Sequence, residues 1–392
     1  MRELVYGNAW DDGPDVAELR SVTRRFVGDF VEQRAQELDE REEFPADLYA
    51  QMARLNMFGI TVPASLGGLG ASARAFSVVM EELAAGYASI ADQVVLVEVV
   101  STLLAQYGSE TQWEEYLRPT LQAEKWCSYA LTEPDAGSDL AAIRTKAERV
   151  DGGWVLDGEK VFIQNAPVAD FAVVLAVTNR ADARHGMSAF VVNLRGTKGV
   201  TVSRREHKMG QRASQLGSVV MDHAEIPGDS LLGEEGLGLQ YMRAVLAKGR
   251  LGIAALALGI SRAALRVARS RANSRAQFGE PIIRKQAIGF AIADMFAEYR
   301  VGRLLVDDAA RHVDTQSPDA TVACSVAKLV TSENCVRHSS AAIQVCGGSG
   351  YLKGNEAERL YRDARVTTIY EGTSEVQRLI LSRAIAREEG EW

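Results

Sequence analysis

The stretch AVVLAVT at residues 172–178 decides the fold class, because it is a short, continuous apolar run. In the long segments before and after this part of the chain, apolar residues instead recur every three or four positions. Similar short β-branched runs begin at Trp154, Ala189 and Ser218, and Gly152-Gly153 marks a turn among them. Short runs of this kind between turn residues are typical of strands. Residues 125 to 235 are therefore predicted to form a small β domain.

Helical periodicity occupies the chain before and after this region. We predict a mainly α protein with a central β domain. It would have an N-terminal helical domain over residues 1–122, a middle β-barrel-like domain over 123–236 and a C-terminal four-helix bundle over 237–392. The longest predicted helices are Ala91 to Tyr107, Tyr241 to Asn273, Gln286 to Val313 and Val322 to Val345.

Composition excludes several classes of function. The 392 residues carry a net charge of −8 without a basic, aromatic-rich run, which argues against nucleic-acid binding. The longest apolar run, Ile253 to Ile260, is too short to span a membrane. The N-terminus lacks a signal-peptide pattern, and four scattered cysteines without a CxxC pair fit reduced thiols. We expect a cytoplasmic protein, and the dispersed histidines indicate no metal site.

Four motifs carry the chemistry. The tetrapeptide Tyr370-Glu371-Gly372-Thr373 alone is most often a solvated turn, but other blocks accompany it. These are LTEPDAGSD at 131–139, RAQFG at 275–279 followed by Gln286, and QVCGGSGY at 344–351. Together and in this order they resemble the acyl-CoA dehydrogenase flavoprotein family, over about residues 15 to 390.

The resemblance implies desaturation of an acyl thioester, which needs a base for the Cα proton and an acceptor for the Cβ hydride. A nicotinamide-type GxGxxG after a strand is absent, so the implied cofactor is FAD. Glu371 is the implied base, because burial would raise its pKa toward a useful range. Its backbone N–H would also polarise the thioester carbonyl. Some relatives place the base at the position of Gly249, where glycine cannot act.

The resemblance also assigns cofactor and substrate contacts. Leu131 and Thr132 would lie at the flavin edge and Ser138 at the pyrophosphate, unless the loop is only a Pro-Gly turn. Phe162 would cover the flavin face. Gln164 replaces the hydroxyl residue that usually bonds flavin N5; its amide can donate that bond, or it is an exposed strand residue. Gly137 and Thr373 complete this group of cofactor contacts. The implied substrate contacts are Ser138, Tyr370, Gly372 and Arg250, the last of which is otherwise a solvated helix charge.

A further group would reach FAD across a subunit interface. The resemblance places here Arg275, Gln277, Phe278, Gln286, Gln344, Gly347 and Gly348. Arginine suits a pyrophosphate, and glycines allow close backbone approach. One FAD would then be shared by two chains, so the resemblance implies at least a dimer, and most often a homotetramer built as a dimer of dimers. The segment from Lys208 to Ser214 resembles one near the thioester tail, although a β-domain turn explains it equally well.

The expected activity is FAD-dependent α,β-dehydrogenation of an acyl-CoA to the trans-2-enoyl thioester, with flavin N5 as hydride acceptor. An electron-transfer flavoprotein or oxygen would reoxidise the flavin. One alternative is dehydrogenation of an acyl group on an acyl carrier protein in polyketide or other secondary-metabolite biosynthesis. Another is an oxygen-using oxidase or monooxygenase, although the monooxygenase form usually lacks the glutamate. A silent scaffold is disfavoured because Glu371 and the FAD-contact residues are present. The acyl chain length stays open.

Overall fold

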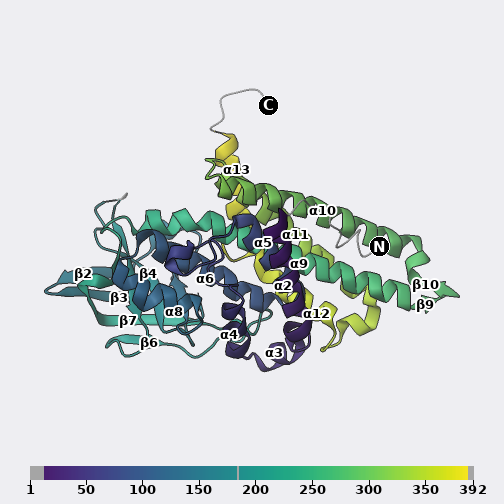
Figure 1. The fold of residues 1–392 in the computed structure, drawn as a ribbon, viewed down its shortest axis with the longest axis horizontal. Coiled ribbons are helices and arrows are strands. Elements are labelled where there is room, and N and C mark those ends of the chain that lie inside the picture. The colour runs from purple at the N-terminus through teal and green to yellow at the C-terminus, as the bar shows by residue number, and fades with distance from the viewer. Residues whose placement is uncertain (1–12, 183–184, 387–392) are drawn as a thin grey trace.

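The computed structural model describes residues 13–182 and 185–386. The sheet forms one end of the molecule, and three long helices extend away from it (Figure 1). The helices that precede the sheet are α2 (Gly13–Phe26), α3 (Ala35–Arg41), α4 (Ala46–Arg54), α5 (Ala73–Gly86), α6 (Ala88–Tyr107), α7 (Glu110–Gln112) and α8 (Arg118–Leu121). A π-helical turn, Val27–Val31, continues α2.

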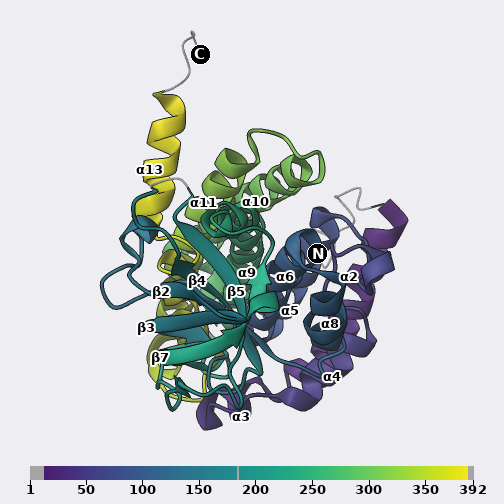
Figure 2. The ribbon, with the colours of Figure 1, turned by 90° about the vertical axis from the view of Figure 1, so that its left-hand side faces the viewer.

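The middle region is one eight-stranded sheet in the order β6-β7-β3-β2-β4-β5-β8, with β1 parallel to β4. Figure 2 shows β7, β3, β2 and β4 side by side, with helices behind them. Every residue of β4 is buried, so this strand lacks alternation. The strands are β1 (Cys127–Ala130), β2 (Lys146–Val150), β3 (Gly153–Gln164), β4 (Phe171–Val177), β5 (Met187–Asn193), β6 (Val200–Val202), β7 (Leu216–Pro227) and β8 (Leu231–Leu232).

The C-terminal region is built on α9 (Gly238–Ser274), a helix of 37 residues. Two of its glycines allow close packing: a Cβ at Gly259 would lie 2.5 Å from the Glu81 carbonyl oxygen, and one at Gly252 would lie 2.9 Å from Val95. A short hairpin, β9 (Ala276–Gln277) and β10 (Glu280–Pro281), leads to the next helix. The remaining helices are α10 (Gln286–Asp314), α11 (Ala320–Cys346), α12 (Glu356–Arg365) and α13 (Ser374–Ile385). The predicted fold class is confirmed.

Two helices, α6 and α9, are long and apolar enough to cross a membrane by composition. Their most apolar windows are, however, 94% and 89% buried inside the protein. Burial of this extent is what core helices of a globular protein show. Their apolar character is therefore accounted for by packing within the fold.

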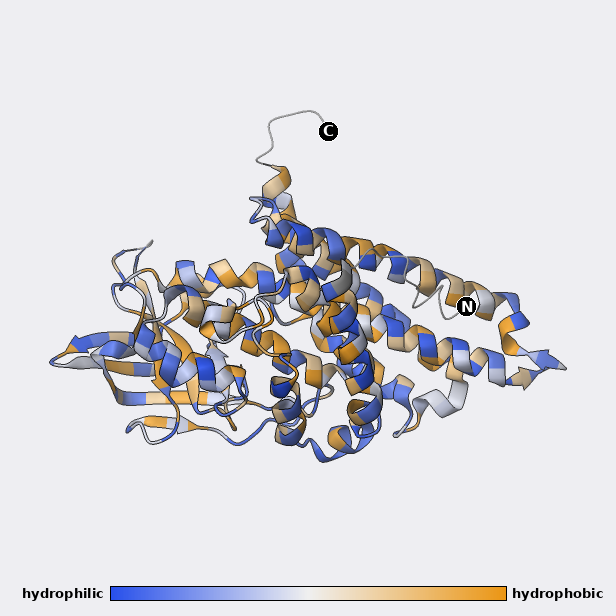
Figure 3. Ribbon diagram, viewed as in Figure 1, coloured by the Kyte–Doolittle hydropathy of each residue, from blue (hydrophilic) through white to orange (hydrophobic). Residues whose placement is uncertain are grey.

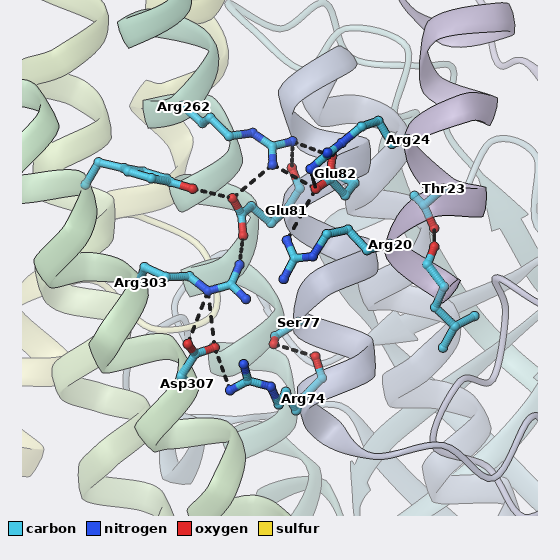
Figure 4. Close-up of polar contacts among 12 residues, drawn as sticks. Arg20, Thr23, Arg24, Arg74, Ser77, Glu81, Glu82, Arg262, Arg303 and Asp307 are labelled. Carbon is cyan, nitrogen blue, oxygen red and sulfur yellow. Dashed lines mark hydrogen bonds and ion pairs between the residues drawn. The ribbon is translucent and has the colours of Figure 1, made fainter. Parts of the chain in front are cut away.

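A buried charge cluster joins four helices (Figure 4). Glu81 and Glu82 of α5 face Arg262 of α9, with nitrogen–oxygen distances of 3.1 and 2.8 Å. Arg303 of α10 also pairs with Glu81, and Arg24 of α2 pairs with Glu82 at 2.8 Å. Burial opposes ionisation of Glu82, but the Arg262 guanidinium outweighs it and holds the pKa of Glu82 below its usual range. The cluster therefore remains charged and holds α2, α5, α9 and α10 in one arrangement.

We predict that Glu81→Gln lowers the free energy of unfolding by about 3 kcal/mol, because buried Arg262 and Arg303 would each lose one of their carboxylate partners. Urea unfolding of the purified protein measures this loss. The matched control is Glu37→Gln, which removes one partner of an exposed pair with Arg41 and should change stability little. Equal losses for the two variants would contradict the importance of the cluster.

Candidate functional site

Glu371 lies in a tight loop before α13, with a φ of +52°, followed by Gly372 at +89°. A left-handed conformation is unfavourable for glutamate and persists only where neighbours hold it. Lys328 of α11 donates to the Gly372 carbonyl at 2.7 Å, and Gln377 donates to the same oxygen at 2.8 Å. Thr373 accepts from the Val376 N–H at 3.2 Å and caps α13. The loop is thus fixed from both sides.

The Glu371 carboxylate lies directly against Gly249 of α9. A Cβ at that position would be only 2.4 Å from Glu371 Oε2. No side chain fits there without moving the carboxylate. The glycine that the sequence shows at an alternative base position is therefore also a steric requirement for the base at Glu371.

Charged groups surround this carboxylate. Burial raises the pKa of Glu371, Arg250 and Lys328 lower it, and Asp92 raises it again, with a net increase. Arg250 is 8% exposed, and its buried Nε has no hydrogen-bond partner among the described residues. Glu371 Oε2 is likewise buried, with no partner among the described residues. A half-buried carboxylate with an unsatisfied oxygen and adjacent cations is an arrangement suited to proton transfer with a ligand.

The middle domain contributes a second part of the site. Phe162 has a φ of +56° and is 70% exposed, at an irregularity in β3 between Lys160 and Ile163. A bulge of this kind re-aims a side chain. Here it presents an aromatic ring outward, which suits the face of a flat ligand such as a flavin.

The loop at 131–139 is tied to the same strand. Buried Lys160 donates to Glu133 Oε1 at 2.8 Å and to the Leu131 carbonyl at 3.1 Å. The Val161 N–H donates to the Thr132 carbonyl at 2.9 Å. Leu131, Thr132 and Phe162 therefore lie close together, whereas sequence reasoning did not identify Lys160. Gly137 and Ser138 lie farther along this loop and are exposed.

Gln164 points inward rather than toward an open edge. Its amide nitrogen donates to Asp92 Oδ2 at 2.8 Å, and lies 3.2 Å from Ser214 Oγ and 3.3 Å from the Asp92 carbonyl. These acceptors engage both amide hydrogens. In this structure the amide is held by Asp92, and the expectation that it donates to flavin N5 stays a prediction. The interpretation of Gln164 as an exposed strand residue is wrong, because its side chain is only partly exposed.

Asp92 and Gln93 were missed by sequence reasoning. Asn165, with a φ of +63°, donates to Gln93 Oε1 at 2.9 Å. The consecutive residues Gln164 and Asn165 therefore bind the consecutive residues Asp92 and Gln93 of α6. A signal was available, because Asp92-Gln93 is a polar pair in an otherwise largely apolar, buried segment. Buried polar residues of this kind require partners.

The remaining predicted cofactor residues lie at the other end of the molecule (Figure 1). Arg275, Gln277 and Phe278 are exposed on and around the β9–β10 hairpin, and Phe278 is 92% exposed. Gln286 begins α10, while Gln344, Gly347 and Gly348 are exposed at the end of α11. Because a helix rises about 1.5 Å per residue, Ser274 lies about 36 Å along α9 from Arg250. A single chain does not bring this group next to Phe162.

A groove of about 1340 Å³ adjoins this distant group. Cys346 and Ser349, which flank Gly347 and Gly348, line it together with Ser274, the neighbour of Arg275. Five arginines also line it: Arg24, Arg262, Arg266, Arg269 and Arg271. Three glutamates share the lining, and two of them, Glu82 and Glu356, pair with Arg24, Arg262 and Arg266. Arg269 and Arg271 are the lining arginines that suit an anionic group such as a pyrophosphate.

Within residues 13–182 and 185–386, one group of side chains could hold a metal ion. Potential ligand atoms of Asp157, Asp222 and His223 lie within 4.8 Å of one another on β3 and β7. His223 already pairs with Asp222 at 2.9 Å, and both side chains are more than four-fifths exposed. An exposed acid–imidazole pair accounts for this cluster without a metal.

Comparison with known proteins identifies the class. Models of the N-terminal, middle and C-terminal domains of acyl-CoA dehydrogenase match residues 13–124, 128–224 and 236–386. The chain belongs to the acyl-CoA dehydrogenase family, as the sequence motifs predicted. It is an oxidoreductase that acts on CH–CH bonds. The family consists of flavoproteins, and the exposed Phe162 ring beside the Thr132 loop fits that cofactor.

Individual relatives cover nearly the whole chain. Subunit CarC of the caffeyl-CoA reductase–Etf complex of Acetobacterium woodii is 38% identical over 93% of this chain and 98% of its own length. Butyryl-CoA dehydrogenase from Megasphaera elsdenii superposes with a TM-score of 0.92 at 33% identity, covering 96% of this chain and 99% of that one. The prolyl acyl carrier protein oxidase AnaB superposes with a TM-score of 0.89 at 26% identity, covering 96% and 100%.

We predict that Gly249→Ala displaces the Glu371 carboxylate, because the new methyl would otherwise lie 2.4 Å from Oε2. A crystal structure of the variant should show this carboxylate moved by about 1 Å or more, the shift that restores an ordinary contact distance. The matched control is Gly28→Ala, whose added methyl meets no atom within 4 Å and should leave the loop unchanged. An unmoved Glu371 in Gly249→Ala would contradict the steric coupling.

Proposed function

We propose that this chain is an FAD-dependent dehydrogenase that converts an acyl-CoA to its trans-2-enoyl thioester. The observation that carries the proposal is the Glu371 carboxylate, whose Oε2 is buried without a partner among the described residues, beside Gly249. Glu371 takes the proton from the substrate Cα. FAD, when bound, supplies the acceptor for the hydride from Cβ.

The surrounding cations suit this role. Arg250 and Lys328 lower the pKa of Glu371, so they offset part of the rise that burial causes. A base must be ionised to accept a proton, yet a raised pKa makes it a stronger acceptor. The Glu371 backbone N–H, with Tyr370 and Gly372 beside it, would orient the thioester carbonyl. Arg250 would add positive charge near the developing enolate.

The cofactor residues fall into two groups that one chain does not bring together. Leu131, Thr132, Gly137, Ser138 and Phe162 would hold the flavin half, with Gln164 and Thr373 behind them. The partner subunit would complete the site with its copies of the exposed group Arg275, Gln277, Phe278, Gln286, Gln344, Gly347 and Gly348. The separation of the two groups along α9 supports an obligatory dimer.

Further exposed apolar residues support a larger assembly. Phe290, Val301 and Leu304 of α10 are 59%, 51% and 55% exposed. Figure 3 shows such hydrophobic residues among hydrophilic ones along α10. Gathered apolar side chains at a surface are typical of subunit contacts. We therefore propose a homotetramer, a dimer of dimers, working in the cytoplasm.

An electron-transfer flavoprotein is the proposed electron acceptor. CarC, similar over nearly the full length, is named as a subunit of an Etf complex. The second candidate function is dehydrogenation of an acyl group held by an acyl carrier protein, with oxygen as acceptor. The similarity to AnaB, a prolyl acyl carrier protein oxidase, supports this second candidate.

The direct test is anaerobic bleaching of the bound flavin. Butyryl-CoA should bleach the wild-type protein, and Glu371→Gln should slow bleaching about 10³-fold, the size of effect expected when a general base is lost. Glu375→Gln, an exposed neighbour in α13, is the matched control and should bleach normally. Bleaching only by carrier-bound acyl groups would replace the first proposal by the second. Flavin-loaded protein that no thioester bleaches would overturn both.

A pH profile tests the role of Lys328. Lys328→Met removes a cation that lowers the pKa of Glu371, so that pKa should rise further. The bleaching rate, which increases as Glu371 ionises, should then begin its rise at a higher pH than in the wild type. Lys328→Arg keeps the charge and should shift the profile less. A profile for Lys328→Met that coincides with the wild type would show that Lys328 does not tune the base.

A further inference from the structure

One stripe of α6 faces the turn of α9 that carries Gly249. Its members are Asp92, Val95, Val99 and Thr102, spaced by three and four residues as one helix face requires. Val99 lies 3.5 Å from the position of a Cβ at Gly249, and Lys248 donates to Thr102 at 2.9 Å. Asp92 therefore occupies the same face of α6 as the residues nearest Glu371. It is the only acidic residue of that stripe.

Asp92 is 5% exposed, and its hydrogen bonds come from neutral groups. Its Oδ2 accepts from Gln164 Nε2 and from Ser214 Oγ, both at 2.8 Å. Its Oδ1 accepts no hydrogen bond from any residue in the described ranges, although a carboxylate oxygen can accept two. The charge of Lys208 favours ionised Asp92, but its ammonium donates to the Ser214 carbonyl and forms no ion pair with Asp92 among the described residues. Asp92 thus lacks an ion-pair partner within the part of the chain that the structure describes.

The charges are distributed unequally across the site. Arg250 and Lys328 lower the pKa of Glu371, whereas the negative charge of Asp92 raises it. Asp92 also raises the pKa of Tyr370. Burial raises the pKa of Asp92 to about 6, which leaves it largely ionised at neutral pH. Arg250 is more than nine-tenths buried beside Glu371, and its Nε has no hydrogen-bond partner among the described residues, which indicates independently that a ligand completes this site.

We propose that Asp92 is a specificity residue that receives a cationic, N–H-donating group on the acyl chain, such as a guanidinium or an ammonium. A plain hydrocarbon chain would bury this carboxylate further without compensation, and an anionic chain would add repulsion. A cation would occupy the free Oδ1 and replace the missing ion-pair partner. The inference rests on the proposed function, since it names the substrate class of that same site.

The structure offers a competing role. Asp92 could act only by orienting Gln164, in which case its charge would not discriminate among acyl chains. The two roles differ in what a neutral replacement does. Loss of a charge-specific contact changes the order of affinities among cationic, neutral and anionic chains. Loss of an orienting contact changes all three affinities by the same factor.

The experiment measures binding without turnover, by isothermal titration calorimetry of FAD-loaded Glu371→Gln protein. The probes are 4-guanidinobutyryl-CoA, hexanoyl-CoA and adipyl-CoA, which carry a cationic, a neutral and an anionic chain end. The guanidino probe should bind about 30-fold more tightly than hexanoyl-CoA, and adipyl-CoA should bind most weakly. Adding Asp92→Asn or Asp92→Val should bring the cationic preference to within about threefold. The matched control is Glu225→Gln, an exposed acid of β7, which should keep the preference.

Two results would overturn the inference. The first is hexanoyl-CoA binding as tightly as the guanidino probe before Asp92 is changed. The second is a uniform change of all three affinities in both Asp92 variants, provided that their flavin spectra and thermal melts match the parent. Flavin bleaching in the wild-type protein separates this failure from that of the proposed function. Bleaching by hexanoyl-CoA with no cationic preference removes only the inference, whereas no bleaching by any thioester removes both.

Discussion

The buried charge cluster around Glu81 and Glu82 is the constraint on which the arrangement of helices depends. A buried guanidinium is tolerated only when carboxylates meet it, so α5, α9 and α10 have one mutual position in which every charge is paired. Apolar contacts alone would allow these helices to slide with little change in buried area. The cluster therefore specifies the register of α9, and α9 in turn carries Gly249 and Arg250 to Glu371.

Once the register of α9 is set, two contacts fix the position of the Glu371 loop. Gly249 removes the side chain that would collide with Glu371, and Lys328 holds the strained loop through the Gly372 carbonyl. Left-handed backbone at Glu371, Phe162 and Asn165 shows where the fold accepts local strain. Each of these residues directs a side chain to a position that a relaxed strand or helix would not reach. Strain of this kind is expected where function rather than stability chose the conformation.

The sequence predicted the layout of the fold well, because its signals were periodic and local. The long helices α9, α10 and α11 begin and end within three residues of their predicted limits. Motif resemblance also singled out Glu371 and the absence of a side chain at Gly249. It did not reveal Lys160, Lys328 or Asp92. A lysine or aspartate in an apolar segment does not show which distant residue it meets, and here the partners Glu133, Gly372 and Gln164 lie 27, 44 and 72 positions away.

The Gln164 position shows how a departure from a family motif gains meaning only in three dimensions. Taken alone, an amide in place of a small hydroxyl residue suggested a longer donor to the same flavin atom. In the structure the amide turns to Asp92, so the two residues form one unit and neither is understood separately. A shorter hydroxyl side chain at 164 would leave Oδ2 of Asp92 with only Ser214 as a donor. The carboxylate on α6 and the amide on β3 therefore depend on each other, so the departure from the family motif at Gln164 is explained only together with Asp92.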